Sequence, residues 1–464
     1  MQRVVYSVIV AFLRLVTRVF FRTVEVVGRD HVPREGAVVF VGNHPNSLVD
    51  PIVITTTCGR RVRFAARDGL FSTPIRPILW ALGSVPIRRK QDQASADAKL
   101  DNSEAFDALH AVLSAGDAFG IFPEGVSYTE PELQPLKTGA ARIALSAVER
   151  GIAVTIVPVG LHYRRKQHFR GRVLVQFGRP IQLRPAASAA EGTSREAARA
   201  LTEDIELALR ALTLNAKDFD TLRVLDGVRR LYVPEERELS LAEEAEVTRR
   251  LVTHWEAKRD VPEVAAFYAD VEAWLAVLDA LGLSDWDLRK PVSSFGWAFR
   301  VMRHVSLLVL EVPLALPGLL LHAPLVWVVT RAGDMFIERD DVKATLRMVV
   351  GVATVLVTYV AIGMAVVAID PSVDGALRAL GVIVFLALSG LAAIRVLEKQ
   401  AVVRHGLRVL TRILAIGGQL DALRAQRDAL RARIPAIAQA HADPTMDRIV
   451  TNDDLVASHT TSEG

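Results

Sequence analysis

Short apolar runs alternate with segments of helical periodicity in the N-terminal half of this chain. Strand-like runs fall at residues 37–41, 62–66, 84–87, 118–122, 155–161 and 173–177, and helical segments at 94–114 and 138–150. Strands interleaved with helices are typical of an α/β domain, which carries its functional groups in the loops at strand ends. We therefore expect a mixed sheet flanked by helices over residues 25–214.

The first 24 residues predict a separate helix with a membrane preference. Arg14, Arg18 and Arg22 recur every four residues among apolar side chains such as Phe12 and Leu15. This pattern is typical of a basic amphipathic helix that lies in a membrane interface, and we favour it over a helix packed only on the soluble domain. The arginines directly after the apolar run, without a small-residue cleavage site, argue against a signal peptide.

Two apolar runs near the C-terminus predict a membrane hairpin. Residues 348–369 carry no charge and are long enough to cross a bilayer, and residues 380–397 are interrupted only by Arg395. Basic residues flank the outer ends of the pair, namely Arg339, Lys343 and Arg347 before it and Lys399 and Arg404 after it. By the positive-inside rule, both outer ends of this hairpin lie in the cytoplasm, a reading we favour over two buried core helices.

The remaining C-terminal segments are assigned by the same patterns. Residues 215–295 read as a soluble helical region, and residues 296–400 as the membrane region that contains the hairpin. Within it, residues 306–329 are apolar but hold Glu311, His322 and three prolines, which favours a re-entrant or interfacial element over a full span. Residues 401–440 predict a C-terminal helix, and residues 441–464 a disordered tail.

Composition agrees with a membrane protein that handles anions. The 464 residues are 51% hydrophobic, with a formal net charge of only +4, yet arginines crowd the first 90 positions. Clustered positive charge on an apolar chain favours anionic lipid surfaces or phosphorylated substrates. No zinc-finger spacing or RNA-binding signature points to nucleic acid as a partner. Cys58 is the only cysteine, so an intrachain disulfide is impossible.

Candidate chemistry begins directly after the first strand-like run. Residues 42–51 place His44 and Asp50 in one short stretch that contains two prolines. A histidine titrates near neutrality, and a nearby carboxylate can orient its ring and stabilise its cationic form. A single His–Asp pair often arises by chance, so its weight depends on the loops further along the chain.

Three later loops carry further candidate groups. Arg88 and Arg89 follow the strand-like run at 84–87, Pro123-Glu124-Gly125 follows the run at 118–122, and Lys137 precedes a helix. Arginine's planar fork suits phosphate, and a glycine beside a helix start can present backbone N–H groups to an anion. Each loop alone is weak, because an arginine pair is usually a solvated patch and Pro-Glu-Gly is usually a turn.

Together, the four blocks resemble the PlsC-like superfamily of glycerolipid acyltransferases. That family shows an Asn-His…Asp block, a glycine-to-arginine block, a Phe-Pro-Glu-Gly block and a Val-Pro block, in this order, and the last corresponds here to Val157-Pro158. The resemblance covers residues 23–181 and implies an α/β acyltransferase domain, followed here by a helical region and C-terminal membrane helices. It also implies a membrane-bound enzyme of phospholipid biosynthesis, with the catalytic domain on the cytoplasmic face.

The resemblance implies a role for each block. His44 would be the general base on the acceptor hydroxyl, with Asp50 orienting its ring. Arg88 and Arg89 would bind the acceptor phosphate, and Glu124 and Gly125 would shape the acceptor pocket. The acyl donor would be acyl-CoA or acyl carrier protein, and the acceptor lysophosphatidate or glycerol 3-phosphate. Neither a metal nor a cofactor is implied, and membrane lipids are the expected surroundings.

Two departures from the family pattern bear on the acceptor. Five residues separate His44 from Asp50 where the family usually has four, which resembles the branch that includes fungal-type glycerol-3-phosphate acyltransferases. Many members carry Thr-Arg after the Phe-Pro-Glu-Gly block, whereas this chain has Val126-Ser127. The phosphate-binding arginine expected there is absent, so Arg88, Arg89 or Lys137 would have to replace it.

Two classes of function remain open on the sequence alone. One is an integral membrane acyltransferase, in which lysophosphatidate and glycerol 3-phosphate compete as acceptors. The other is a non-catalytic membrane tether or lipid-binding protein that retains the acyltransferase fold. The intact set of His44, Asp50, Arg89 and Glu124 favours the enzyme. Acyl length, donor type and oligomeric state are not readable from these patterns.

Overall fold

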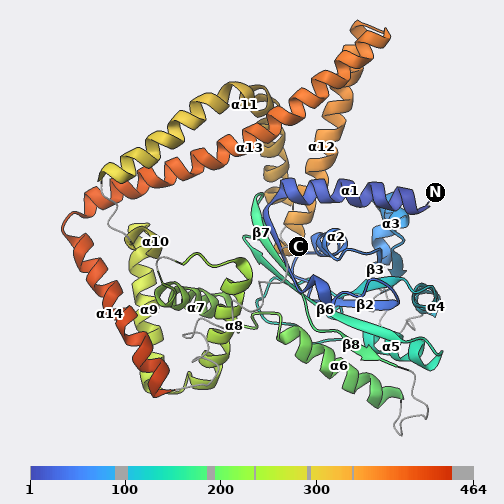
Figure 1. The fold of residues 1–464 in the computed structure, drawn as a ribbon, viewed down its shortest axis with the longest axis horizontal. Helices are drawn as coiled ribbons and strands as arrows, with labels where there is room; N and C mark the ends of the chain where they lie inside the picture. Colours follow the sequence, from blue (N-terminus) through green and yellow to red (C-terminus); the bar gives the residue numbers. More distant parts are fainter. Residues whose placement is uncertain are drawn as a thin grey trace. The chain divides into compact units, whose positions relative to one another are not determined.

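A computed structural model describes residues 2–88, 103–184, 194–234, 237–289, 294–336 and 339–441 (Figure 1). The chain divides into two compact units. Unit 1 comprises residues 1–218, 240–245 and 337–348, and unit 2 comprises residues 219–239, 246–336 and 349–464. Each unit has its own buried apolar cluster.

Unit 1 is built on one eight-stranded sheet with the order β1-β7-β6-β2-β5-β3-β4, and with β8 paired to β6. Its strands are β1 (Phe21–Val27), β2 (Ala37–Gly42), β3 (Val62–Arg67), β4 (Val85–Ile87), β5 (Ala118–Ile121), β6 (Val154–Arg164), β7 (Gly171–Phe177) and β8 (Ile181–Leu183). The strands β6, β2, β5, β3 and β4 run parallel, while β7 and β8 pair antiparallel with β6. The sheet is therefore mixed, as the sequence predicts.

The helices of unit 1 are α1 (Gln2–Phe20), α2 (Val49–Thr57), α3 (Arg76–Leu82), α4 (Ser103–Ser114), α5 (Gly139–Glu149) and α6 (Ser194–Arg210), with short 3-10 turns at Arg29–His31 and Asp68–Ser72. Figure 1 shows α1 and α2 on one side of the sheet and α5 and α6 on the other. All six residues of β2 are buried, as an interior strand covered on both faces requires. Val39 and Val41 pack toward α4, α5 and α6, whereas Val38 and Phe40 pack toward α2. This alternation follows from the two-residue period of a strand.

The parallel strands bring their carboxyl ends to one edge of the sheet. The loops after β2, β5 and β4 and the end of β6 therefore share this edge. The sequence placed six of the eight strands, and it missed β1 and β8. Strand β1 begins at Phe21 and pairs in parallel with β7, so the first helix ends at Phe20.

Helix α1 has two apolar faces with different surroundings. Tyr6, Val10 and Phe20 are buried, and the Tyr6 hydroxyl bonds to the backbone of Val62. A second stripe stays exposed and is formed by Val4, Val8, Phe12 and Leu15. The spacing of this stripe places it on one side of the helix, apart from the packed face.

Unit 2 is helical in the part that the structure describes. Its elements are α7 (Phe219–Tyr232), α8 (Leu241–Lys258), α9 (Pro262–Leu281), α10 (Asp285–Leu288), α11 (Ser294–Phe336), α12 (Asp340–Ile369), α13 (Val373–Ile416) and α14 (Gln419–Ala440). Helices α8 and α12 both begin in unit 1 and continue in unit 2. Helices α7, α9 and α14 pack together. The buried guanidinium of Arg427 on α14 bonds to Asp285 at 2.7 Å, so both charges have a partner.

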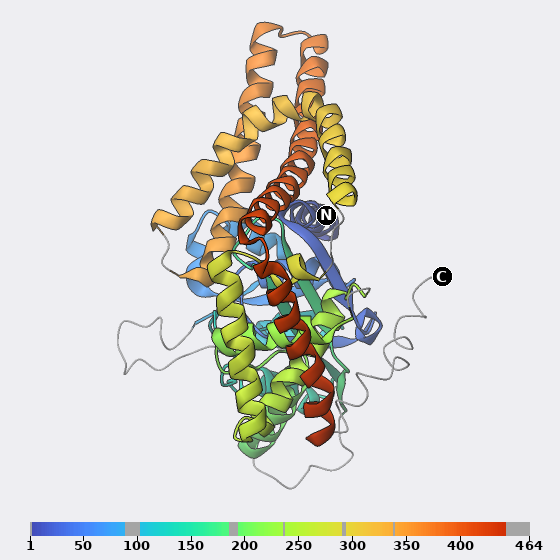
Figure 2. The ribbon, with the colours of Figure 1, turned by 90° about the vertical axis from the view of Figure 1, so that its left-hand side faces the viewer.

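Three helical segments are long and apolar enough to cross a membrane: Glu311–Arg331, Val342–Ile369 and Val373–Ile416. The stretch that the sequence favours as re-entrant lies inside α11, which changes direction near its middle (Figure 2). There the buried Ser389 hydroxyl of α13 accepts from Gly318 N at 2.7 Å and donates to Leu314 O at 2.6 Å. This side chain stands between two groups that would otherwise bond within the helix, beside Pro313 and Pro317, which accounts for the bend.

The core of unit 1 predicts the effect of a truncation on stability. Leu109 on α4 is fully buried in the cluster between the sheet and α4, α5 and α6. We expect Leu109→Ala to lower the free energy of unfolding by about 2–5 kcal/mol, because it leaves a cavity. Leu207→Ala is the matched control, since Leu207 is 68% exposed on α6, and its effect should stay within about 0.5 kcal/mol. Equal losses of detergent-phase thermal stability would contradict this core assignment.

Candidate active site

The loop that carries His44 is anchored where β2 leaves the sheet. The Asn43 side chain donates to Leu161 O at 3.0 Å and accepts from Leu161 N at 2.7 Å. These two bonds extend the pairing of β2 with β6 by one residue beyond Gly42. The direction in which the chain turns out of the sheet is therefore fixed immediately before His44.

His44 and Asp50 form a hydrogen-bonded pair. His44 Nδ1 lies 2.8 Å from Asp50 Oδ2, and the Asp50 side chain is fully buried. Asp50 sits in the first turn of α2, where a negative charge is favourable. The five intervening residues fit because Ser47 adopts a left-handed φ of 46°, and Val49 N and Asp50 N bond back to Asn46 O and Ser47 O. The extra residue in the loop is thus compatible with a direct pair.

Asp50 accepts two further hydrogen bonds. Asn46 N donates to Oδ2 at 2.7 Å, and the Tyr163 hydroxyl, from the end of β6, donates to Oδ1 at 2.6 Å. Burial, together with the negative charge of Asp50, raises the pKa of Tyr163 well above its usual value, so the phenol stays protonated and remains a donor. These donors offset the cost of burying a carboxylate.

The pair fixes the chemistry of the histidine ring. A carboxylate only accepts hydrogen bonds, so Nδ1 of His44 carries the proton and Nε2 is left as the basic nitrogen. The ring stacks on Phe122, with 4.0 Å between the ring centroids and 5° between the planes. The side chain remains 18% exposed, so the ring is both held and accessible.

Glu124 holds the backbone on both sides of the site. Its Oε1 accepts from His44 N at 2.8 Å, and its Oε2 accepts from Gln134 N at 3.4 Å. Burial raises the pKa of Glu124 to about 7; the two backbone donors oppose this rise, and the charge of Asp50 adds to it. The sequence predicts that Glu124 shapes the acceptor pocket, and in the structure its carboxylate is a support for the His44 loop.

Gly125 and Lys137 lie against each other. Gly125 has φ +78°, and a Cβ at this position would lie 2.4 Å from Lys137 Nζ. Lys137 N donates to Pro123 O at 2.9 Å, which ties the start of α5 to the turn after β5. The left-handed φ favours glycine at this position, and the lysine amine lies beside the turn that follows Phe122.

Arg88 follows β4 at the same edge of the sheet. Its side chain is 67% exposed and pairs at 3.9 Å with Asp68, which is itself 56% exposed. The structure thus puts Arg88 at the predicted edge but joins it to a surface carboxylate. Arg89, the predicted phosphate ligand beside it, lies outside the described residues.

A small open recess adjoins His44. Three carboxylates line it, those of Glu124, Glu130 and Glu132, together with Asn43, His44, Pro45, Tyr128, Pro131, Leu133 and Thr213. Among the described residues, no three His, Cys, Asp or Glu side chains are grouped as metal ligands. The recess is acidic, so it does not favour a phosphate group.

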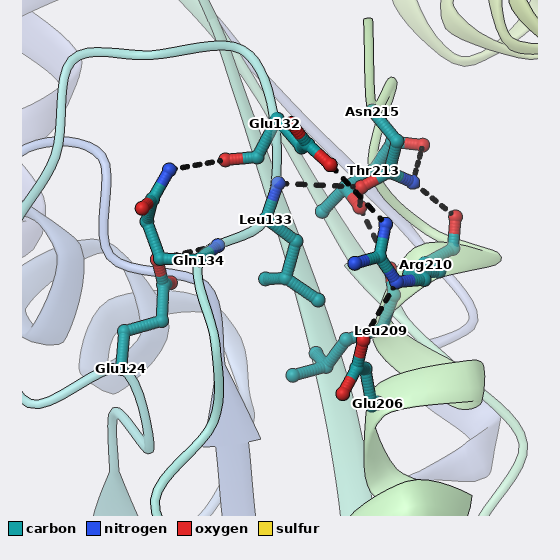
Figure 3. Close-up of polar contacts among 9 residues, drawn as sticks. All are labelled: Glu124, Glu132, Leu133, Gln134, Glu206, Leu209, Arg210, Thr213 and Asn215. Atoms are coloured by element: carbon teal, nitrogen blue, oxygen red, sulfur yellow. Dashed lines mark hydrogen bonds and ion pairs between the residues drawn. The ribbon is translucent and has the colours of Figure 1, made fainter. Parts of the chain in front are cut away.

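Figure 3 shows how the wall of this recess is tied to the turn after α6. Leu133 N donates to Asn215 Oδ1 at 3.4 Å, and Asn215 Nδ2 donates to Arg210 O at 2.8 Å. Asn215 adopts a left-handed φ of 53°, a conformation that asparagine tolerates well. The segment that reaches Glu124 through Gln134 N is therefore held at its other side by Asn215.

Both parts of the chain match known families. Residues 23–162 match the family described as Acyltransferase, and residues 224–446 match the family described as Glycerol-3-phosphate acyltransferase 2 C-terminal domain. The chain therefore carries a PlsC-like acyltransferase domain, followed by a C-terminal domain of the glycerol-3-phosphate acyltransferase 2 type. This confirms the resemblance drawn from the four sequence blocks.

Two yeast proteins are similar in sequence to large parts of this chain. Glycerol-3-phosphate O-acyltransferase 1 of Saccharomyces cerevisiae is 24% identical over 462 residues, covering 77% of this chain and 61% of that protein. Glycerol-3-phosphate O-acyltransferase 2 of the same yeast is 31% identical over 261 residues, covering 54% of this chain and 35% of that protein. The chain thus spans less than two thirds of the length of either relative.

A solved structure is also similar to part of the chain. The 1-acyl-sn-glycerophosphate acyltransferase PlsC of Thermotoga maritima has 20% sequence identity and a TM-score of 0.32. The match covers 44% of this chain and 81% of that one.

The sequence did not predict two side chains of this candidate site, those of Tyr163 and Asn215. Tyr163 lies 113 positions from Asp50 in the chain, so only the pairing of β6 with β2 brings the two together. Asn215 lies beyond the last predicted strand, in a segment without a sequence signal for function. A tyrosine two residues after the strand-like run at 155–161 was the one available hint of a polar strand end.

The raised pKa of Glu124 predicts a pH dependence of stability. The folded state binds this proton more tightly than the unfolded state, so its contribution is present below about pH 4.5 and is lost as the pH rises to about 7. Relative to Glu124→Gln, the free energy of unfolding of the wild type should therefore fall by roughly 3 kcal/mol over this window.

Thermal unfolding in detergent at pH 5 and pH 8 measures this difference. Glu130→Gln is the matched control, because it removes an exposed carboxylate from the same loop. A wild type that loses no more stability than Glu124→Gln between these pH values would contradict the assignment.

Proposed function

We propose that this protein transfers a fatty acyl group from a thioester donor to a hydroxyl group of a phosphorylated glycerol. The observation that carries the proposal is the pair formed by His44 and the buried Asp50, with the histidine ring accessible at the sheet edge. The donor is acyl-CoA or acyl carrier protein. Among acceptors we favour glycerol 3-phosphate over lysophosphatidate, because both yeast relatives are named glycerol-3-phosphate O-acyltransferases.

The proposed reaction needs one base and no acyl-enzyme. Nε2 of His44 takes the proton of the acceptor hydroxyl, while the hydroxyl oxygen bonds to the thioester carbonyl carbon. The tetrahedral intermediate then collapses, the carbon–sulfur bond breaks, and the departing thiolate takes the proton from the imidazolium. Asp50 stabilises the imidazolium that forms between these steps, and Tyr163 and Asn46 N hold Asp50 in place.

The predicted phosphate ligands remain part of the proposal. Arg88, Arg89 and Lys137 would bind the phosphate of the acceptor, and Gly125 gives Lys137 room beside the turn after β5. Glu124 would act on the acceptor pocket indirectly, by holding His44 and the Gln134 segment. The alternative class, a non-catalytic tether, predicts equal background rates of acyl transfer for wild type and His44→Ala.

We also propose that the protein is integral to a membrane, with the catalytic unit on the cytoplasmic face. Three helical segments have the length and hydropathy of membrane spans, and basic residues flank the hairpin formed by Val342–Ile369 and Val373–Ile416. The exposed stripe of α1 supports an additional contact of unit 1 with the membrane surface.

Loss of the base tests the catalytic proposal. We expect His44→Ala to lower the rate of acyl transfer about 10²–10⁴-fold, because positioned acid–base catalysis contributes this much. The measurement uses purified membranes, labelled acyl donor and either glycerol 3-phosphate or lysophosphatidate as acceptor. His405→Ala is the matched control, since His405 is 55% exposed on α13 in unit 2.

Both acceptors are needed for a clear result. Faster transfer to glycerol 3-phosphate than to lysophosphatidate by the wild type would support the favoured acceptor. Equal background rates for wild type and His44→Ala with both acceptors would overturn the catalytic proposal and leave the tether.

Cysteine accessibility tests the membrane orientation. In a Cys58→Ser background the chain has no other cysteine, so a single label site can be introduced. We expect Asp374→Cys, exposed in the first turn of α13 next to the connection between the two hairpin helices, to react with an impermeant maleimide added outside sealed right-side-out vesicles. Leu207→Cys, exposed on α6 of the catalytic unit, should react only after permeabilisation. The opposite pattern would reverse the proposed orientation.

A further inference from the structure

The first turns of α12, residues 339–348, are part of the catalytic unit. Ala344 is fully buried and Met348 is 4% exposed, and both belong to the core cluster that contains Phe20 and Val53. A segment almost 300 positions after α2 in the chain therefore completes the core on the α1 and α2 face of the sheet. This makes the start of α12 a fixed element of unit 1.

Three cations lie within this segment, spaced four residues apart. They are Arg339, which directly precedes α12, Lys343 and Arg347. Side chains four residues apart lie on the same side of a helix, and this row runs beside the buried positions Ala344 and Met348. The packing of those two residues consequently determines the direction of the row.

Both ends of the row contact loops of the catalytic unit. Arg347 Nη1 donates to Gln167 O at 2.5 Å, in the connection between β6 and β7. Arg339 Nη2 donates to Ser127 O at 3.5 Å, in the loop after β5. Ser127 is one of the two residues that replace the family's Thr-Arg.

The same two loops hold the His44 turn. Tyr128 N, next to Ser127, donates to His44 O at 3.0 Å. Lys166, next to Gln167, donates from Nζ to Pro45 O at 3.3 Å and to Thr129 O at 3.4 Å. A fourth cation therefore bridges the two loops directly beside the catalytic histidine.

Cations contact the loops beside the recess, whose own lining is acidic. The recess carries the carboxylates of Glu124, Glu130 and Glu132. Lys166, Arg339 and Arg347 contact the two loops beside it, and Lys343 lies between the two arginines along the chain. Arginine and lysine are the side chains that bind phosphate oxygens in proteins.

We propose that Lys166, Arg339, Lys343 and Arg347 form a phosphate-binding site, the cationic rim, next to His44. It takes the place of the arginine that the family carries after Gly125. The inference rests on the proposed function for the identity of the phosphate, which comes from the acceptor, from the nucleotide of CoA or from an anionic lipid headgroup. The C-terminal region then contributes to substrate binding as well as to the membrane anchor.

A double variant tests the cationic rim in the full chain. We expect Lys343→Gln/Arg347→Gln to raise the KM for its phosphate-bearing substrate tenfold or more, with kcat changed less than threefold. Arg404→Gln/Arg408→Gln is the matched control, because it removes two exposed cations four residues apart on α13 in unit 2. Thermal unfolding and the conservative variant Arg347→Lys, which should keep most of the wild-type KM, separate lost charge from lost folding.

Three comparisons identify the phosphate. A change confined to glycerol 3-phosphate assigns the acceptor, and a change for acyl-CoA but not for acyl-pantetheine, which lacks the nucleotide phosphates, assigns the donor. A change seen only when nanodiscs of phosphatidylglycerol replace nanodiscs of phosphatidylcholine assigns a lipid headgroup. Unchanged kinetics in all three comparisons would overturn the rim.

Binding without turnover keeps this result independent of the proposed function. The dissociation constants of glycerol 3-phosphate and CoA are measured by calorimetry on His44→Ala, with and without the double change. Weaker binding in a protein whose wild type transfers no acyl group would support the rim and reject the proposed function. An active wild type with equal constants in both proteins, and with no effect of the double change in phosphatidylglycerol nanodiscs, would reject the rim alone.

Discussion

A single buried carboxylate sets the geometry of the candidate site in unit 1. Asp50 is fully buried, and a charge in that position is tolerated only when hydrogen bonds replace its lost water. Its donors come from the His44 ring, from the backbone of Asn46 and from Tyr163 at the end of β6. The loop after β2, the start of α2 and the end of β6 must therefore meet at one point, and the orientation of the histidine follows from that meeting.

The backbone around this point is held by a second buried carboxylate. Glu124 accepts from His44 N and from Gln134 N, and Asn43 ties the end of β2 to Leu161. The two carboxylates differ in what they hold: Asp50 orients a side chain, whereas Glu124 fixes the main chain that carries it. Burial affects the pKa of Glu124 strongly because its partners are neutral N–H groups.

Unit 1 and the apolar helices of unit 2 share one element, α12. The start of α12 belongs to the core of the catalytic unit, while the remainder of that helix is apolar enough to cross a bilayer. A helix shared in this way places cations at a defined position relative to the catalytic loops. The proposed cationic rim and the acidic recess would then offer two different environments beside one histidine, in keeping with the proposed phosphorylated glycerol acceptor.

The sequence by itself determined the local features of this protein. Runs of apolar residues and their periods located six strands and the apolar stretches, and the four blocks identified the family, because these signals reside in neighbouring residues. It could not place Tyr163 beside Asp50, 113 positions away, or Arg347 beside Gln167, 180 positions away. It also gave Arg88 no partner, whereas the fold pairs it with Asp68. Only the tertiary structure decided these contacts, because they depend on which strands become neighbours and on which apolar faces bury each other, and that choice is made by packing across the whole unit.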